Sequence, residues 1–318
     1  LARADKAARA KAKRDSLAAV AAAKKLAKEK ERDWQAKISG ILSGSVTSFD
    51  SSKTLEQINS HLKKKPGQQK PVELKGLLHF AKDEYEPAVA ALGKVKKKNN
   101  RVSKVIALSY FNLGEYKKST VWFKKVAASD LGQKERENYA LALDKSGAKK
   151  SAAAQYEKVL SKHKKSAPAF AFLMNHYRKP LAKQKLITTL EKYHKINPND
   201  AQIVLELADL YGKASSTGMK YREKYLKLSP DDKIAELKLA RQYEGLGKKQ
   251  QAIKIYLKYA GSYKSDYDYN NKLAGLLFSQ GKKNESVTYY ERALEQKYND
   301  KKILNILVDL YVENKKTK

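Results

Sequence analysis

The residues best suited to acid–base or metal chemistry are five histidines and two adjacent acid pairs. No two histidines have the spacing that would place two metal ligands on one helix; they are His61, His79, His163, His176 and His194. The acid pairs, Asp83 with Glu84 and Asp231 with Asp232, fall in expected turns, where carboxylates cap helices. There is no cysteine, no Gly-rich phosphate loop and no G-x-S-x-G motif. The sequence therefore predicts neither a catalytic site nor a cofactor, and we expect the chain not to be an enzyme.

A second chemistry, binding of single-stranded nucleic acid, is raised by 20 tyrosines among many lysines. Bases can stack on aromatic rings beside a basic surface. Most of these tyrosines, however, fall at spacings typical of helix packing, so they are predicted to be core residues. Tyr263, Tyr267 and Tyr269 cluster in an expected turn, where a partner could contact them, although packing at the surface is the simpler interpretation.

The net charge of +33 comes from 67 basic and 34 acidic residues, and only 10 of the basic residues are arginine. Lysine attracts anions diffusely, whereas arginine is preferred for bidentate recognition of phosphates and bases. The lysine runs at 63–65, 94–98 and 162–165 lie near different turns, which is typical of a solvated surface. The excess still favours anionic partners at low salt, including acidic proteins, lipid headgroups, cell-wall polymers and nucleic acid.

The expected helices that carry these residues recur at a regular spacing along the sequence. Small residues recur every 31 to 34 positions and mark a series of first helices, with Met174 and Val308 the only bulky members: Gly76, Ala107, Ala140, Met174, Ala208, Ala240, Ala274 and Val308. One turn further on each helix comes His79, Tyr110, Leu143, Tyr177, Tyr211, Tyr243, Leu277 or Tyr311. The period predicts one structural unit repeated along the chain.

A matching series predicts the second helix of each unit. Its mostly small positions are Ala88, Ser119, Ala152, Leu186, Gly218, Ala252 and Ser286. Four residues later comes Leu92, Phe123, Tyr156, Leu190, Arg222, Tyr256 or Tyr290. We interpret each unit as a helix hairpin whose small residues lie where the two helices approach most closely. One hairpin cannot bury its own apolar face, so neighbouring hairpins must stack.

This pattern resembles the tetratricopeptide repeat (TPR) family, over roughly residues 69 to 318. Gly114, Tyr116, Ser119 and Phe123 fit one copy of the repeat, and Gly281, Ser286, Tyr290 and Ala293 fit another. The resemblance, here to bacterial TPR-containing proteins, implies an all-α fold, an α-solenoid in which helix hairpins form a right-handed superhelix. Departures occur in the central copies, where Leu186 replaces a small residue and the copy at 201–232 is two residues short. We expect these copies to pack irregularly.

Four segments are expected. Residues 1–50 form a basic, Ala- and Lys-rich N-terminal helix and linker, and 51–68 a leading helix or degenerate repeat. Residues 69–300 hold seven repeats, and 301–318 form a capping helix with Leu304, Leu307 and Tyr311 facing the stack. No apolar run is long enough to span a membrane. Because the sequence begins at Leu1, we expect residues upstream of it, and a removed signal peptide or anchor stays open.

The resemblance also implies a concave groove lined by the first helices. Its candidate partner-binding residues are Lys104, Phe111, Asn112, Asn138, Lys145, Asn175, Arg178, Lys179, Arg241, Asn271 and Asn305. A cationic, amide-rich groove suits an extended peptide with acidic side chains or a free carboxylate. Lys104 and Asn138 fit two places of the family's carboxylate clamp, but Leu108, Pro168 and Phe172 occupy others. Binding of chaperone C-termini is therefore not expected.

The leading hypothesis is a non-catalytic scaffold that binds an acidic protein or peptide in a bacterial multi-protein or cell-envelope assembly. Absence of cysteine favours the periplasm or envelope, with the cytoplasm as the alternative. The other hypothesis is a polyanion binder for nucleic acid or envelope polymers, with residues 1–37 as an electrostatic arm. The partner, the oligomeric state and the docking of the N-terminal helix are not determined by the sequence.

We predict that Ala252→Leu lowers the free energy of unfolding by about 1 to 3 kcal/mol, because the larger side chain overpacks the close helix contact. Urea unfolding of the two proteins measures this difference. A melting temperature equal to that of the wild type would show that the proposed register is wrong.

Overall fold

The computed structural model describes residues 14–26, 28–29, 32, 51–212 and 214–316. The chain divides into two compact units, residues 1–172 and 173–318, and each is described by itself. Residues 14–26, 28–29 and 32 are helical and exposed; the remainder of the predicted N-terminal helix and linker lies outside the described residues. The described residues contain helices and no strand.

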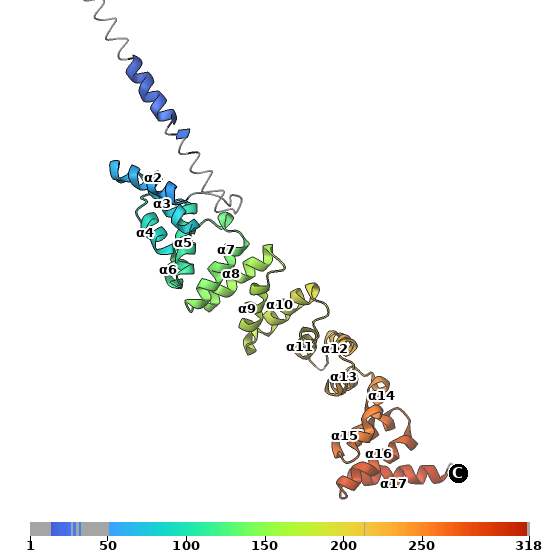
Figure 1. Cartoon of the computed structure of the whole chain (residues 1–318). Helices are drawn as coiled ribbons and strands as arrows, with labels where there is room; N and C mark the ends of the chain where they lie inside the picture. The colour runs from blue at the N-terminus through green and yellow to red at the C-terminus, as the bar shows by residue number, and fades with distance from the viewer. Residues whose placement is uncertain (1–13, 27, 30–31, 33–50, 213, 317–318) are drawn as a thin grey trace, which may run out of the picture. The chain divides into compact units, whose positions relative to one another are not determined.

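The first unit is a stack of helix hairpins (Figure 1). A leading helix, α2 (Ser51–Lys64), precedes three hairpins: α3 (Gln69–Ala81) with α4 (Tyr85–Gly93), α5 (Asn100–Asn112) with α6 (Tyr116–Phe123), and α7 (Gln133–Lys145) with α8 (Lys149–Lys162). Helix α2 is part of this unit's core because Ile58 is fully buried against Leu74, Leu77 and Leu78. Helix α9 (Ala167–Tyr177) begins here and continues into the second unit.

The second unit repeats the arrangement. Its helices are the remainder of α9 with α10 (Lys183–Ile196), α11 (Ala201–Tyr211) with α12 (Ser216–Leu228), α13 (Lys233–Gly245) with α14 (Lys249–Tyr259), α15 (Tyr267–Ser279) with α16 (Lys283–Gln296), and a last helix α17 (Lys301–Lys316). Stacked helix hairpins without strands are the architecture of an α-solenoid. Among the described residues, no helix is both long and apolar enough to cross a bilayer.

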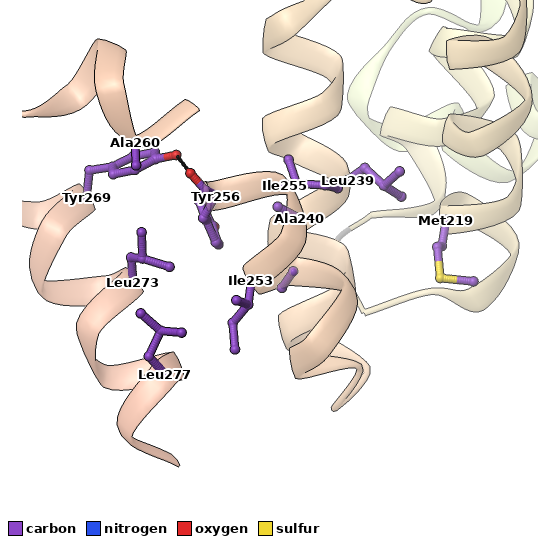
Figure 2. Packing of buried hydrophobic residues seen from close by; sticks show 11 residues of the cluster. Met219, Leu239, Ala240, Ile253, Ile255, Tyr256, Ala260, Tyr269, Leu273 and Leu277 are labelled. Atoms are coloured by element: carbon purple, nitrogen blue, oxygen red, sulfur yellow. Dashed lines mark hydrogen bonds between the residues drawn. The ribbon is translucent and has the colours of Figure 1, made fainter. Parts of the chain in front are cut away.

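The predicted close contacts between paired helices are confirmed. All seven second-helix positions of the small series are buried, from Ala88 in α4 to Ser286 in α16. Gly218 shows why size matters, because a Cβ atom there would lie 2.9 Å from Cβ of Tyr211 on the paired helix. The larger residues beside these positions fill the core, as Figure 2 shows for Tyr256, Leu273 and Leu277. The register inferred from the sequence for the second helices, α4 to α16, is therefore the register of the fold.

The turn within each hairpin explains the recurring glycine. Gly114 has a φ of 74°, in the left-handed region that favours glycine. In the first hairpin the corresponding residue is Asp83, which has a φ of 59°. The expectation that Asp83 and Glu84 cap a helix is therefore wrong: Asp83 forms the left-handed turn, and the Glu84 side chain pairs with Lys82 at 2.8 Å instead of capping α4. Asp232 does cap α13, accepting from the Ala235 amide.

Two further expectations are corrected. Tyr269 is buried, its ring stacks on Tyr263 at 4.4 Å, and its hydroxyl donates to the Tyr256 carbonyl, so it is a core residue. On α17 the buried residues are Ile303, Leu307 and Leu310, whereas Leu304 and Tyr311 are exposed. In the hairpins, the first-helix positions of the small series face the second helix of the same hairpin. Among the described residues, no second helix follows α17. Helix α17 therefore turns only its α16-facing side inward.

The central irregularity expected from the sequence is present in the second unit. A short 3-10 helix, η2 (Pro180–Ala182), intervenes between α9 and α10, and Leu181 at its centre is fully exposed. In the short copy, α11 and α12 are joined through Gly212, which has a φ of 84°. The first-helix position filled by Met174 is only partly buried, whereas the others up to Ala274 are buried.

At three junctions of the second unit, successive helices are joined by a hydrogen bond between residues 20 positions apart. Tyr211 donates to Glu191 at 2.5 Å, Tyr243 donates to Glu223 at 2.8 Å, and Tyr311 donates to Glu291. Each links a first helix to the second helix before it, and we call these contacts the Tyr–Glu latches. Burial, followed by the hydrogen bond to Glu223, raises the pKa of Tyr243 to about 12.

We predict that Tyr243→Phe lowers the free energy of unfolding by about 0.5 to 1.5 kcal/mol at pH 7, the usual range for one lost hydrogen bond. The raised pKa favours the neutral phenol in the fold. Its contribution is complete below pH ~10, where an unfolded tyrosine titrates, and is lost as the pH rises toward 12.

Urea unfolding at pH 7 and a tyrosinate absorbance titration of both proteins measure the two effects. The variant is expected to lose less stability than the wild type between pH 10 and 12, because it lacks this group. Equal stability at pH 7 and equal alkaline slopes would show that the latch contributes nothing.

Candidate functional site

The groove candidates of the first unit lie on its first helices. Lys104, Phe111 and Asn112 belong to α5, Asn138 and Lys145 belong to α7, and all five side chains are exposed or partly exposed. Lys104 is already engaged: its Nζ lies 3.6 Å from Oε1 of Glu135 and donates to the Asp130 carbonyl oxygen at 3.2 Å. This cation therefore links α5 to the segment that leads into α7.

The candidates of the second unit are distributed in the same way. Asn175 lies near the end of α9, and Arg178 and Lys179 follow directly after that helix. The others lie on α13, α15 and α17: Arg241, Asn271 and Asn305. Arg178 forms a two-pronged ion pair with Glu206, with Nε to Oε1 at 2.9 Å and Nη2 to Oε2 at 2.8 Å. We use "first-helix face" for the exposed side of the first helices within one unit.

Ion pairs connect consecutive first helices along this face of the second unit. Besides Arg178 with Glu206, Lys238 Nζ lies 3.3 Å from Oδ2 of Asp209, and Lys272 Nζ lies 3.0 Å from Oε2 of Glu244. Much of the positive charge on the face is thus balanced by acids that the sequence pattern did not single out. Exposed pairs of this kind contribute little to stability but fix the position of long side chains.

A cavity of about 250 Å³ opens on this face, and it brings one predicted residue together with several unpredicted ones. Arg241 is the predicted residue, and the others are Ala208, Asp209, Gly212, Arg222, Lys238 and Gln242. These residues come from the consecutive helices α11, α12 and α13 and from the turn after α11. Lys238 and Asp209 are each 46% exposed, so the cavity communicates with solvent.

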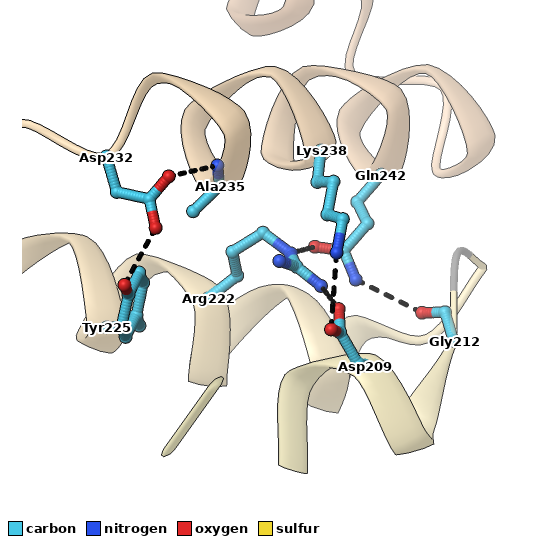
Figure 3. A network of polar contacts seen from close by, with 8 residues as sticks. All are labelled: Asp209, Gly212, Arg222, Tyr225, Asp232, Ala235, Lys238 and Gln242. Atoms are coloured by element: carbon cyan, nitrogen blue, oxygen red, sulfur yellow. Dashed lines mark hydrogen bonds and ion pairs between the residues drawn. The ribbon is translucent and has the colours of Figure 1, made fainter. Parts of the chain in front are cut away.

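Arg222 is the centre of the polar cluster at this cavity (Figure 3). Its side chain is 3% exposed, its Nη2 donates to Oδ1 of Asp209, and its Nε donates to Oε1 of Gln242 at 3.0 Å. The Gln242 amide nitrogen in turn donates to the Gly212 carbonyl at 3.1 Å. One buried guanidinium therefore ties together three helices and the turn between the first two.

The electrostatic balance of the cluster is positive. Three cationic side chains, Arg222, Lys238 and Arg241, surround one carboxylate, Asp209. Burial tends to raise the pKa of Asp209, but the hydrogen bonds and charges of Arg222 and Lys238 hold that pKa below its usual value. The remaining nitrogen of the Arg222 guanidinium, Nη1, is buried and has no hydrogen-bond partner among the described residues. The Arg222 guanidinium is thus only partly satisfied, and because Nη1 has almost no accessible surface, this nitrogen does not face the open space of the cavity.

The sequence analysis did not identify the residues of this cavity, although one feature of the sequence pointed to Arg222. At the second-helix packing position the other hairpins have Leu92, Phe123, Tyr156, Leu190, Tyr256 or Tyr290, and only this hairpin has a charged residue. A charged residue in a buried series must be paired or must serve a site. The partners Asp209 and Gln242 follow only from the structure, because their positions vary freely in the repeat pattern.

We predict that Asp209→Ala lowers the free energy of unfolding by about 1 to 3 kcal/mol, because Arg222 then keeps Gln242 as its remaining partner. The matched control is Arg222→Leu, which installs the residue found at the equivalent positions 92 and 190. Replacing a buried charge by an apolar residue is often neutral or stabilising, so this control should be at least as stable as the wild type. Urea unfolding at pH 7 measures the stability of both variants and of the wild type. If Arg222→Leu were less stable than Asp209→Ala, this account of the cluster would be refuted.

The comparisons with known proteins concern the fold. Residues 271–295 match the family model described as "Tetratricopeptide repeat". A search of curated proteins gives no match to the chain. Among solved structures, the chain is similar to the C-terminal part of a TPR repeat-containing protein from Cytophaga hutchinsonii, at 19% identity and a TM-score of 0.36 over 73% of this chain and 98% of that one.

Two other solved structures show the same level of similarity. A tetratricopeptide repeat protein from Parabacteroides merdae is 15% identical, with a TM-score of 0.36 over 89% of this chain and 99% of that one. YrrB, described as a TPR protein with an unusual peptide-binding site, is 14% identical, with a TM-score of 0.40 over 57% of this chain and 96% of that one.

The matched segment 271–295 covers most of the α15–α16 hairpin. The preceding hairpins share its buried small positions and its large packing residues. The match therefore shows a tetratricopeptide repeat at residues 271–295, and the preceding hairpins repeat its packing.

Proposed function

We propose that this chain is a non-catalytic scaffold that binds a protein or peptide partner through the first-helix face. The observation that supports the proposal most directly is the cavity on the second unit, where a buried arginine and two exposed cations surround unfilled space. A tetratricopeptide-repeat fold is compatible with this role, because such folds typically serve protein interaction.

The chemistry of the face favours an extended acidic peptide. Exposed Asn175, Asn305 and Lys179 can pair with a peptide backbone and with carboxylates, in addition to the cations at the cavity. Most acids on the face already belong to ion pairs, so they oppose an incoming acidic segment only weakly. We further propose that the partner belongs to a bacterial multi-protein or cell-envelope assembly, as the composition suggests.

The test is site-specific photocrosslinking in native extract. A photoreactive residue is placed at Asn175 or Asn271 on first helices, and at exposed Thr188 or Thr288 on second helices as matched controls. We expect the same protein to crosslink from Asn175 and Asn271 and not from the two control positions. Equal capture from all four positions would refute the assignment of the first-helix face.

A second candidate function, polyanion binding, is favoured by one specific observation besides the net charge of +33. Lys125 and Lys98 lie over the Trp122 ring, at 4.0 Å and 5.9 Å from its centroid, which places an aromatic surface between cations. Repeating the capture at about 50 mM and about 300 mM salt separates the two functions, because phosphate contacts weaken sharply over this range. Protein crosslinks that survive at the higher salt support the scaffold, whereas nucleic acid or polymer retained only at the lower salt supports polyanion binding.

A further inference from the structure

The presence of Arg222 at a core position needs a physical explanation. Burial of a guanidinium is unfavourable unless its donors find acceptors, and the apolar residues at the equivalent positions of the other hairpins avoid that penalty. Asp209 and Gln242 satisfy Nη2 and Nε, but Nη1 has no partner among the described residues. Structural pairing alone therefore accounts for only part of this side chain.

The space beside Arg222 has the properties of a ligand site. Its volume of about 250 Å³ equals that of roughly eight water molecules, at about 30 Å³ for each in the liquid. This is enough room for a carboxylate or phosphate group with part of the chain that carries it. Gly212, in the turn after α11, forms part of the wall.

The charge of the walls selects the sign of the ligand. Arg222 lies at the base, whereas Lys238 and Arg241 are exposed and lie on the same side of α13, three residues apart. Lys238 already contacts Asp209 at 3.3 Å, but that carboxylate is shared with Arg222, so one anion serves two cations. Three positive charges against one negative charge exclude a cation as the preferred occupant and favour an oxyanion.

We propose that the cavity between α11, α12 and α13 is an oxyanion-binding subsite that takes a carboxylate or phosphate group carried by a bound peptide. The inference rests on the proposed function, since the peptide lies along the first-helix face. Lys238 and Arg241 contact the oxyanion at the mouth, and the Arg222 guanidinium provides the positive wall. Gln242 is a positioning residue, because its hydrogen bonds to Arg222 and to Gly212 hold the guanidinium in place.

The experiment uses the full chain labelled with ¹⁵N-arginine, in which 10 arginines give a simple spectrum of side-chain Nε–H signals. The signal of Arg222 is assigned by its loss in Arg222→Leu, which is expected to fold. Three acetylated and amidated pentapeptides are titrated at constant ionic strength, identical except for a central Glu, phosphoserine or Gln. Inorganic phosphate is titrated separately.

We expect the Arg222 signal to shift and saturate with the Glu or the phosphoserine peptide but not with the Gln peptide. Whichever acidic peptide saturates at the lower concentration identifies the source of the oxyanion. Arg241→Gln should weaken this binding at least threefold, whereas Arg292→Gln, an arginine on the second helix α16 and outside the cavity, should leave it unchanged.

Three results would overturn the inference. No saturable shift with any oxyanion means that the cluster is structural only. Parallel shifts of all arginines, equal in Arg241→Gln, mean that diffuse charge attracts the probes. Saturation by inorganic phosphate with neither acidic peptide binding means a site for a free ion. If Asn175 and Asn271 still crosslink to the partner but the Arg222 signal does not shift with either acidic peptide, the subsite is refuted and the proposed function is not.

Discussion

The close approach of the two helices within each hairpin is the constraint on which the structure depends. Most hairpins have a small residue at this position on each helix, and the α9–α10 pair, with Met174 and Leu186, is the exception. At Gly218 even a Cβ atom would lie 3.1 Å from the Ala208 carbonyl oxygen of the paired helix. Once the two axes lie this close, the residues one turn away project into the space between successive hairpins and form the core. The helix pair is thus the structural unit, and stacking supplies the apolar area that a single pair lacks.

This constraint also explains how far the fold could be predicted. The small and large series were visible in the sequence because each depends on local geometry that the hairpins repeat, and the second-helix positions of both series are buried from Ala88 to Tyr290. The prediction was wrong where a unit lacks a residue or a helix that the other repeats have. Asp83 was given a capping role because the glycine of the turn is absent there, and α17 was given the wrong buried side because the register presumes a paired helix.

The candidate site was less accessible to sequence reasoning for the same reason. Arg241 could be placed on a first helix by its position in the repeat, but its neighbours in the cavity come from three helices and a turn. Asp209 and Lys238 occupy exposed positions that the repeat leaves free to vary, so nothing in the period marks them as partners. Arg222 was identifiable as an exception within an apolar series, and that exception is the signal that leads to the cavity.

The polar cluster has a consequence for how motion is distributed along the second unit. In a one-dimensional stack each hairpin depends on its neighbours, and the α11–α12 hairpin has a guanidinium where the others have apolar contact area. An anion bound beside Arg222, in contact with Lys238 and Arg241, would tighten this hairpin and, through the latches at Tyr211 and Tyr243, also α10 and α13. Backbone amides on both sides would then exchange hydrogen more slowly, so that a small group bound in one cavity stiffens a segment several helices long.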